Sequence, residues 1–267
     1  SHTYSMEAPK GSDMSSPIQS QHLASFTRLK DLAWDADGET LVWLEGRGAD
    51  NVIVSQSPGD AHPRDLTEDA TVRTRIGYGG GEFTVAGGTV YFVEGAERLL
   101  AVPTGGGGLR CVTETGGFAS SPTVSTDGCW ILFVCSEGGI DSLKLAAADG
   151  TSRLWQLATG ADFYMQPVWH PEGHSLAWIE WDHPQMPWDG TRLLLGALGR
   201  GRDGEPLLKQ TTHIAGGPNT AVFQPAFSPD GRYLSYVSDE SGWGRIRLHD
   251  LDSATVSTPE RAERATS

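Results

Sequence analysis

The sequence predicts an all-β fold: a β-propeller made of four-stranded antiparallel blades. Glycine accounts for 34 of the 267 residues and only 20% of residues are charged, which favours short strands joined by tight turns over long exposed helices. Five segments repeat one plan of strand, glycine turn and alternating strand. Their turn glycines lie 50, 40, 45 and 58 residues apart, and a period of about 40–50 residues with several strands per unit is typical of propellers.

The repeated segments define the blades. They are AWDADGETLVWLEG (33–46), FTVAGGTVYFVEG (83–95), PTVSTDGCWILFVCSEG (122–138), PVWHPEGHSLAWIEW (167–181) and PAFSPDGRYLSYVSDE (225–240). Their turn glycines supply the positive φ that tight hairpins need; they are Gly38, Gly88, Gly128, Gly173 and Gly231. A third strand and a fourth, more polar one follow each hairpin, so we expect four strands per blade with the innermost first. About five blades result, at roughly 27–67, 81–114, 118–159, 163–214 and 222–260. Tryptophans such as Trp43 and Trp130 are expected to pack between blades.

Features outside the repeats limit the class of protein. Residues 1–20 are polar and serine-rich, which predicts a flexible leader; blades occupy 21–260, and 261–267 form a polar tail. The formal net charge of −14 disfavours nucleic acid and anionic membranes as partners, and no apolar run reaches the ~20 residues of a membrane span. Three cysteines without C-x-x-C spacing are expected to be reduced thiols, with one disulfide as the alternative. Together with the lack of a signal-peptide pattern, this predicts a cytoplasmic protein.

The most unusual stretch is IEWDHPQMPWDG (179–190), which combines two tryptophans, two aspartates, a histidine and two prolines. It falls between the second and third strands of blade four, where Pro184 and Pro187 exclude regular pairing. One interpretation is a rigid corner with its tryptophans folded back onto the blade. The other is a contact surface for a second domain or a substrate. A catalytic role for Asp182 with His183 lacks a nearby nucleophile.

Loops between strands two and three share one rim of the ring with the segments that lead into strand one. The five glycine hairpins then lie on the opposite face. The candidates for substrate or domain contact on the loop rim are Glu82, Phe163, Trp181, Asp182, His183, Trp188, Asp189, Asp239, Glu240 and Trp243. This rim is aromatic and acidic, and its acids could attract the free amino terminus of a peptide over about one ~8 Å Debye length.

Two further motifs suggest ligands but support none. The glycines of YGGGEF (78–83) are not followed by a helix whose amides could hold a phosphate. WHPEGH places His170 and His174 across a turn, but a metal ion would need further ligands that the sequence does not locate. An enzyme that works with a metal in the central tunnel would need inward acids or histidines, and the inner strands are apolar and small. We therefore predict no cofactor, no metal site and no catalytic residue.

Three stretches carry a family resemblance: VRTRIGYGGGEFTVAGGTVYFVEG, WDHPQMPWDGTRL and FQPAFSPDGRYLSYVSDESGW. They resemble the propeller of the prolyl oligopeptidase superfamily of serine peptidases, in particular its acylaminoacyl-peptidase and dipeptidyl-peptidase-like bacterial branch, over about residues 16–260. The resemblance implies a following α/β-hydrolase domain with its serine in a G-x-S-x-G elbow. That motif and any βαβ alternation are absent here, so the catalytic domain is expected to be missing and the chain to be an inactive fragment.

Two functions follow as expectations. The first is a non-catalytic propeller that gates short peptide substrates for a serine peptidase, with the C-terminal hydrolase domain of the parent chain as its partner. The alternative is a stand-alone propeller scaffold that binds a protein partner. The resembling enzymes usually have seven or more blades, so the resemblance implies that the five blades form an incomplete ring. Such a ring would leave apolar lateral faces open, which favours self-association.

Overall fold

A computed structural model describes residues 27–78, 81–151 and 153–259 of the chain. The predicted leader (1–20), the tail (261–267) and two glycines of the YGGGEF motif lie outside the described residues. The described residues contain no helix with the length and apolar character that a membrane crossing requires. Over these described ranges the regular structure is entirely β, as the sequence predicts.

The strands form five four-stranded antiparallel sheets, each in the order of the chain. Blade one contains β1 (Thr27–Trp34), β2 (Leu41–Arg47), β3 (Asp50–Gln56) and β4 (Arg64–Asp65), and blade two contains β5 (Phe83–Ala86), β6 (Thr89–Glu94), β7 (Arg98–Pro103) and β8 (Arg110–Glu114). Blade three contains β9 (Phe118–Val124), β10 (Trp130–Glu137), β11 (Ile140–Ala147) and β12 (Trp155–Ala158). Blade four contains β13 (Phe163–Trp169), β14 (Ser175–Trp181), β15 (Arg192–Arg200) and β16 (Pro206–Gly216), and blade five contains β17 (Val222–Phe227), β18 (Tyr233–Ser238), β19 (Arg245–Asp250) and β20 (Thr255–Ser257).

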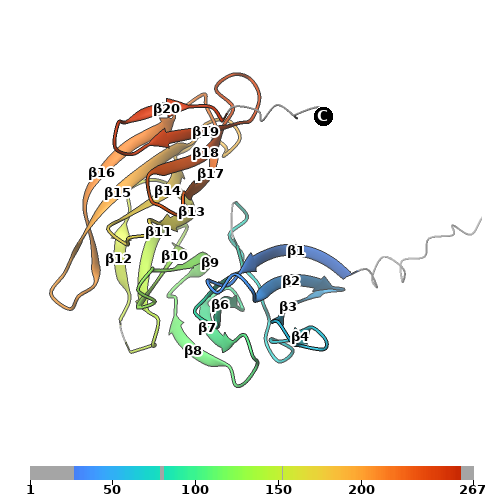
Figure 1. Ribbon diagram of the computed structural model, residues 1–267. Coiled ribbons are helices and arrows are strands. Elements are labelled where there is room, and N and C mark those ends of the chain that lie inside the picture. Colours follow the sequence, from blue (N-terminus) through green and yellow to red (C-terminus); the bar gives the residue numbers. More distant parts are fainter. Residues whose placement is uncertain (1–26, 79–80, 152, 260–267) are drawn as a thin grey trace, which may run out of the picture.

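The first strand of each blade lies innermost. β1, β5, β9, β13 and β17 contact one another in that order, and Figure 1 shows the blades along an open arc with blades one and five at its ends. Four apolar clusters fill the four interfaces between consecutive blades. No such cluster of the described residues joins blade five to blade one. The predicted incomplete ring of five blades is confirmed.

The open side of blade one carries apolar side chains. Leu29, Leu32 and Trp34 of β1 are exposed, and Leu32 pairs with Trp43 on the same face of the sheet. The prediction that Trp43 packs between blades is therefore wrong. Trp43 lies on the open face of blade one, where its indole N–H donates to Glu45 at 2.6 Å. Trp130, by contrast, lies buried in the core between blades three and four.

The predicted hairpin turns are confirmed at all five glycines, whose φ values lie between +69° and +76°. In several of these turns, an aspartate carboxylate accepts hydrogen bonds from neighbouring turn residues. The Asp37 carboxylate accepts hydrogen bonds from the amides of Thr40 and Glu39, which lower its pKa. Asp230 accepts from Ser228 and Arg232 with the same effect on its pKa. The turns of blades one and five are thus held by local bonds that the sequence itself specifies.

Candidate functional site

The loop 182–191 joins β14 to β15 and stands over a cluster of aromatic rings. Phe163 and Trp181 pair across β13 and β14, and their rings stack with centroids 5.0 Å apart. Tyr78 meets Trp181 edge-on at 6.0 Å and Trp188 at 6.4 Å. We call Tyr78, Phe163, Trp181 and Trp188 the rim aromatic cluster. Offset and edge-on ring pairs of this kind contribute about 0.5–1.5 kcal/mol each beyond the area they bury.

The tryptophan that ends β14 and the tryptophan of the loop differ in their surroundings. Trp181 is 2% exposed and belongs to the core between blades four and five, whereas Trp188 is 64% exposed at the loop. Both interpretations of this stretch hold in part. At Trp181 the chain folds onto the blade as a rigid corner, and at Trp188 it presents an aromatic side chain outward. A large exposed indole on a braced loop is suited to contact another molecule or domain.

Tyr78 reaches the cluster from a distant part of the chain. It belongs to residues 66–82, the connector between β4 of blade one and β5 of blade two. This connector passes blade three, where the Thr74 hydroxyl donates to the Ala119 carbonyl at 2.7 Å and the Arg75 guanidinium lies 5.2 Å from the Phe118 ring centre. The sequence analysis did not include Tyr78 among the site residues, because nothing in its local pattern indicates a contact with blade four.

Polar bonds hold the loop at its base. The Asp182 carboxylate accepts from the Arg192 guanidinium at 2.7 Å and from the Asp162 amide at 3.0 Å. The Asp162 carboxylate in turn accepts from the His183 amide at 2.8 Å and faces its Nδ1 at 3.0 Å. These bonds, the His183 amide first, lower the pKa of Asp162. Asp182 and His183 thus position the loop, and Asp189 accepts from the Met186 amide within it at 3.0 Å.

The remaining predicted rim residues do not join this cluster. Asp239 accepts from the Ala221 amide at 2.8 Å and is a structural bond of blade five, while Glu240 pairs with Arg247 at 3.5 Å. Trp243, on the loop between β18 and β19, is 78% exposed. Glu82 lies half-buried in a separate cavity beside blade one. Among the described residues, no ring contact, hydrogen bond or ion pair links these four residues to the rim aromatic cluster.

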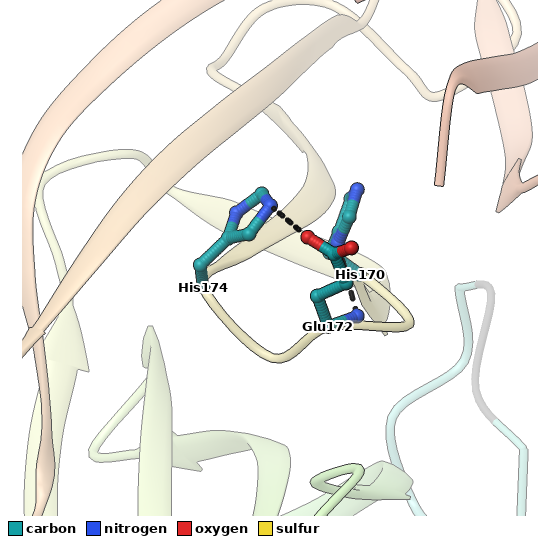
Figure 2. Close-up of side chains that lie close together, drawn as sticks. All are labelled: His170, Glu172 and His174. Atoms are coloured by element: carbon teal, nitrogen blue, oxygen red, sulfur yellow. Dashed lines mark hydrogen bonds and ion pairs between the residues drawn. The ribbon is translucent and has the colours of Figure 1, made fainter. Parts of the chain in front are cut away.

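The hairpin between β13 and β14 brings His170, Glu172 and His174 together (Figure 2). One ligand atom from each lies within 4.8 Å of the others, so the structure adds Glu172 to the two histidines noted in the sequence. However, Nδ1 of the buried His170 accepts the Glu172 amide N–H at 3.1 Å, and its Nε2 faces the Gly231 carbonyl at 2.9 Å. Both ring nitrogens are therefore in use, and a metal ion could reach Nδ1 only by displacing an amide hydrogen bond. We interpret His170 as a clasp that ties the hairpin of blade four to that of blade five.

Comparisons with known proteins add a family relationship. No family model matches the chain, and no curated protein matches it. Among solved structures, a Mycobacterium tuberculosis puromycin-hydrolyzing peptidase is 25% identical with a TM-score of 0.76, over 92% of this chain and 41% of that chain. A mutant of puromycin hydrolase complexed with PGG is 25% identical with a TM-score of 0.77, over 93% of this chain and 41% of that chain.

A second group of structures shares the fold alone. A putative TolB from Agrobacterium tumefaciens is 17% identical with a TM-score of 0.62, over 87% of this chain and 80% of that chain. The chain spans about 41% of the length of the peptidases in the first group. The shared fold, the sequence identity and this partial span agree with the residues that carry the resemblance, and the chain is homologous to the propeller portion of prolyl-oligopeptidase-family peptidases.

Proposed function

We propose that this chain is the substrate-gating propeller portion of a serine peptidase that acts on short peptides. The observation that carries the proposal is the likeness to peptidases over 41% of their length, together with the absence of a G-x-S-x-G motif from this sequence. The catalytic serine, acid and histidine would then belong to an α/β-hydrolase domain that partners the propeller. A propeller over such a site limits access to short or unfolded chains.

In this proposal the loop rim faces the hydrolase domain. Trp188 stands exposed on a loop whose base is braced by the Asp182–Arg192 ion pair. Its indole has the size and rigidity of residues that dominate interface energetics. Trp188 is thus the residue that we expect to touch either the partner domain or a peptide that enters between the two.

A stand-alone scaffold that binds a protein partner remains the second candidate. Two observations favour it. The chain shares its fold with the putative TolB and covers 80% of the length of that protein, and Trp188 and Trp243 are exposed. The coding sequence beyond residue 267 distinguishes the two candidates. The peptidase portion requires a G-x-S-x-G motif there, and the scaffold does not.

The gating role is tested by replacing Trp188→Ala and, separately, Asp182→Ala in the full-length product of the coding sequence. Each variant should change kcat/KM for peptide hydrolysis by about fivefold or more, because about 1 kcal/mol or more depends on a buried interface tryptophan or its brace. Val256→Ala, which removes an exposed apolar side chain far from the loop on β20, is the control. Unchanged kinetics on both short and longer peptides would contradict a gating role for this loop.

A further inference from the structure

A cavity of about 480 Å³ opens on the same rim beside blade one. Its walls come from β1, from the turn between β2 and β3, and from residues 70–74 of the connector. Three cationic side chains line it: Arg28, Lys30 and Arg73. We call this cavity the cationic pocket. Its volume falls in the range of about 300–1,000 Å³ that is usual for small-ligand sites.

Unlike several other basic residues of the described chain, these three cations form no ion pair within 4 Å; Lys30 interacts with Glu82 only at longer range. Arg47, Arg98 and Arg192, for example, each form ion pairs within 4 Å. Within the part of the chain that the structure describes, no ion pair or side-chain hydrogen bond is formed by Arg28, Lys30 or Arg73. Three like charges around one cavity repel one another, and an anion between them would relieve that repulsion.

The acids of the pocket do not neutralise it. Asp50 and Glu82 also line the cavity, so with all five groups ionised its charge is 3 − 2 = +1 in a protein whose net charge is −14. Glu82 is half-buried; burial raises its pKa, and the nearby Lys30 opposes that shift. Glu82 therefore acts as an internal competitor for the cations, which an incoming carboxylate can replace.

The connector links this pocket to the rim aromatic cluster. Arg73 lines the pocket and Tyr78 belongs to the cluster. Five residues of extended chain span at most roughly 18 Å, so the two sites lie within the reach of a peptide of about five residues. One rim thus offers an aromatic surface and a cationic cavity at a separation that a short peptide can bridge.

We propose that the cationic pocket binds the C-terminal carboxylate of a short peptide. Arg28, Lys30 and Arg73 would contact the carboxylate, and the rim aromatic cluster would receive an apolar side chain nearer the amino terminus. The proposal rests on the proposed function in that a peptide is the ligand, and it deepens that function by naming the end of the peptide that is held. The expectation that the acids of this rim attract the amino terminus stays a separate prediction, which the acetylated peptide tests.

Calorimetric titration of the 267-residue chain tests the proposal with the peptide Phe-Ala-Ala-Ala-Ala, its C-terminal amide and its N-acetyl form. The free acid should bind, amidation should weaken binding by about tenfold, and acetylation should leave it unchanged, since charge-assisted bonds to a carboxylate are lost only on amidation. Arg73→Gln and Lys30→Gln should each weaken binding of the free acid several-fold. Glu82→Gln should strengthen it by removing the competitor. Lys209→Gln removes an equally exposed charge from β16 and is the control.

Four results would overturn the pocket: no binding of the free acid at millimolar concentration, equal binding of acid and amide, equal loss in the Lys209→Gln and Arg73→Gln variants, or loss on acetylation together with loss in Glu82→Gln. The last would assign the amino terminus to Glu82. Variants whose circular dichroism and unfolding temperature match the wild type exclude misfolding as a cause. The proposed gating function and the pocket are tested by different results. If Trp188→Ala leaves peptide hydrolysis unchanged while binding still requires the free carboxylate, the gating function is refuted and the pocket is supported.

Discussion

Trp181 ends β14 and Trp188 lies in the loop that follows it, but only Trp181 is buried. The difference comes from partners distant in sequence: Trp181 stacks on Phe163, and Tyr78 approaches both tryptophans from the connector. The sequence could predict a stiff, aromatic loop from its prolines and tryptophans. It could not predict which indole faces outward, because that depends on tertiary contacts rather than on local pattern.

His170 yields a prediction at the same scale. His170→Ala should destabilise the chain by about 2 kcal/mol, because it leaves the Glu172 amide and the Gly231 carbonyl without their partner and opens a space in a buried site. Gly231 approaches the His170 ring so closely that even an added Cβ would lie 2.5 Å from it. His174→Ala, at the exposed neighbour, should change the free energy of unfolding by less than about 0.5 kcal/mol. Chemical denaturation measures both.

Zinc addition completes this test. Since both ring nitrogens of His170 are engaged, Zn²⁺ should not raise the unfolding temperature of the wild type. A rise in the wild type that His174→Ala abolishes would instead identify the hairpin as a metal site.

At the scale of elements, the hairpins could be predicted because residues within each turn determine its conformation. Each turn combines a glycine with positive φ and, in blades one, three and five, an aspartate whose carboxylate accepts bonds from the turn. At Asp127 burial opposes the shift, but the Ser125 hydroxyl, the Cys129 amide and the nearby Arg200 together outweigh it, so its pKa is still lowered. Sequence therefore placed all five blades within a few residues of the observed strands.

Two features of the elements escaped prediction. The inner strands of blades three, four and five carry irregularities at Ser121, Gln166 and Gln224, which have positive φ although they are not glycines. Each precedes a proline, and the Gln166 side chain accepts from the Gln224 amide at 2.7 Å. Such conformations cost about 1–3 kcal/mol and persist only where the surrounding structure fixes them. The sequence also could not predict that the connector 66–82 passes blade three, because its contacts there are with residues distant in the chain.

For the whole molecule, the repeat period predicted the propeller, and the family resemblance implied that its five blades form an incomplete ring. The core agrees with this architecture. Apolar clusters fill the four interfaces between consecutive blades, and the lateral face of blade one that points away from blade two is exposed. The cationic pocket was not predicted, since its cations come from β1 and the connector, which only the fold brings together.

The open face of blade one leads to a prediction about association. The chain should self-associate in a concentration-dependent manner, because Leu29, Leu32 and Trp34 expose apolar surface that can be buried between copies. Leu32→Gln combined with Trp34→Gln should shift the chain towards the monomer in sedimentation velocity. Ile140→Gln, at a similarly exposed position in blade three, should not. A wild type that is monomeric at all concentrations would refute the role of this face.

The central claim, that this chain is a non-catalytic part of a serine peptidase, is tested most directly with a fluorophosphonate probe that labels activated serines. We expect background labelling of the 267-residue chain and labelling of a single serine beyond residue 267 in the full-length product. Stoichiometric labelling of any serine within residues 1–267, or none in the full-length product, would contradict the claim.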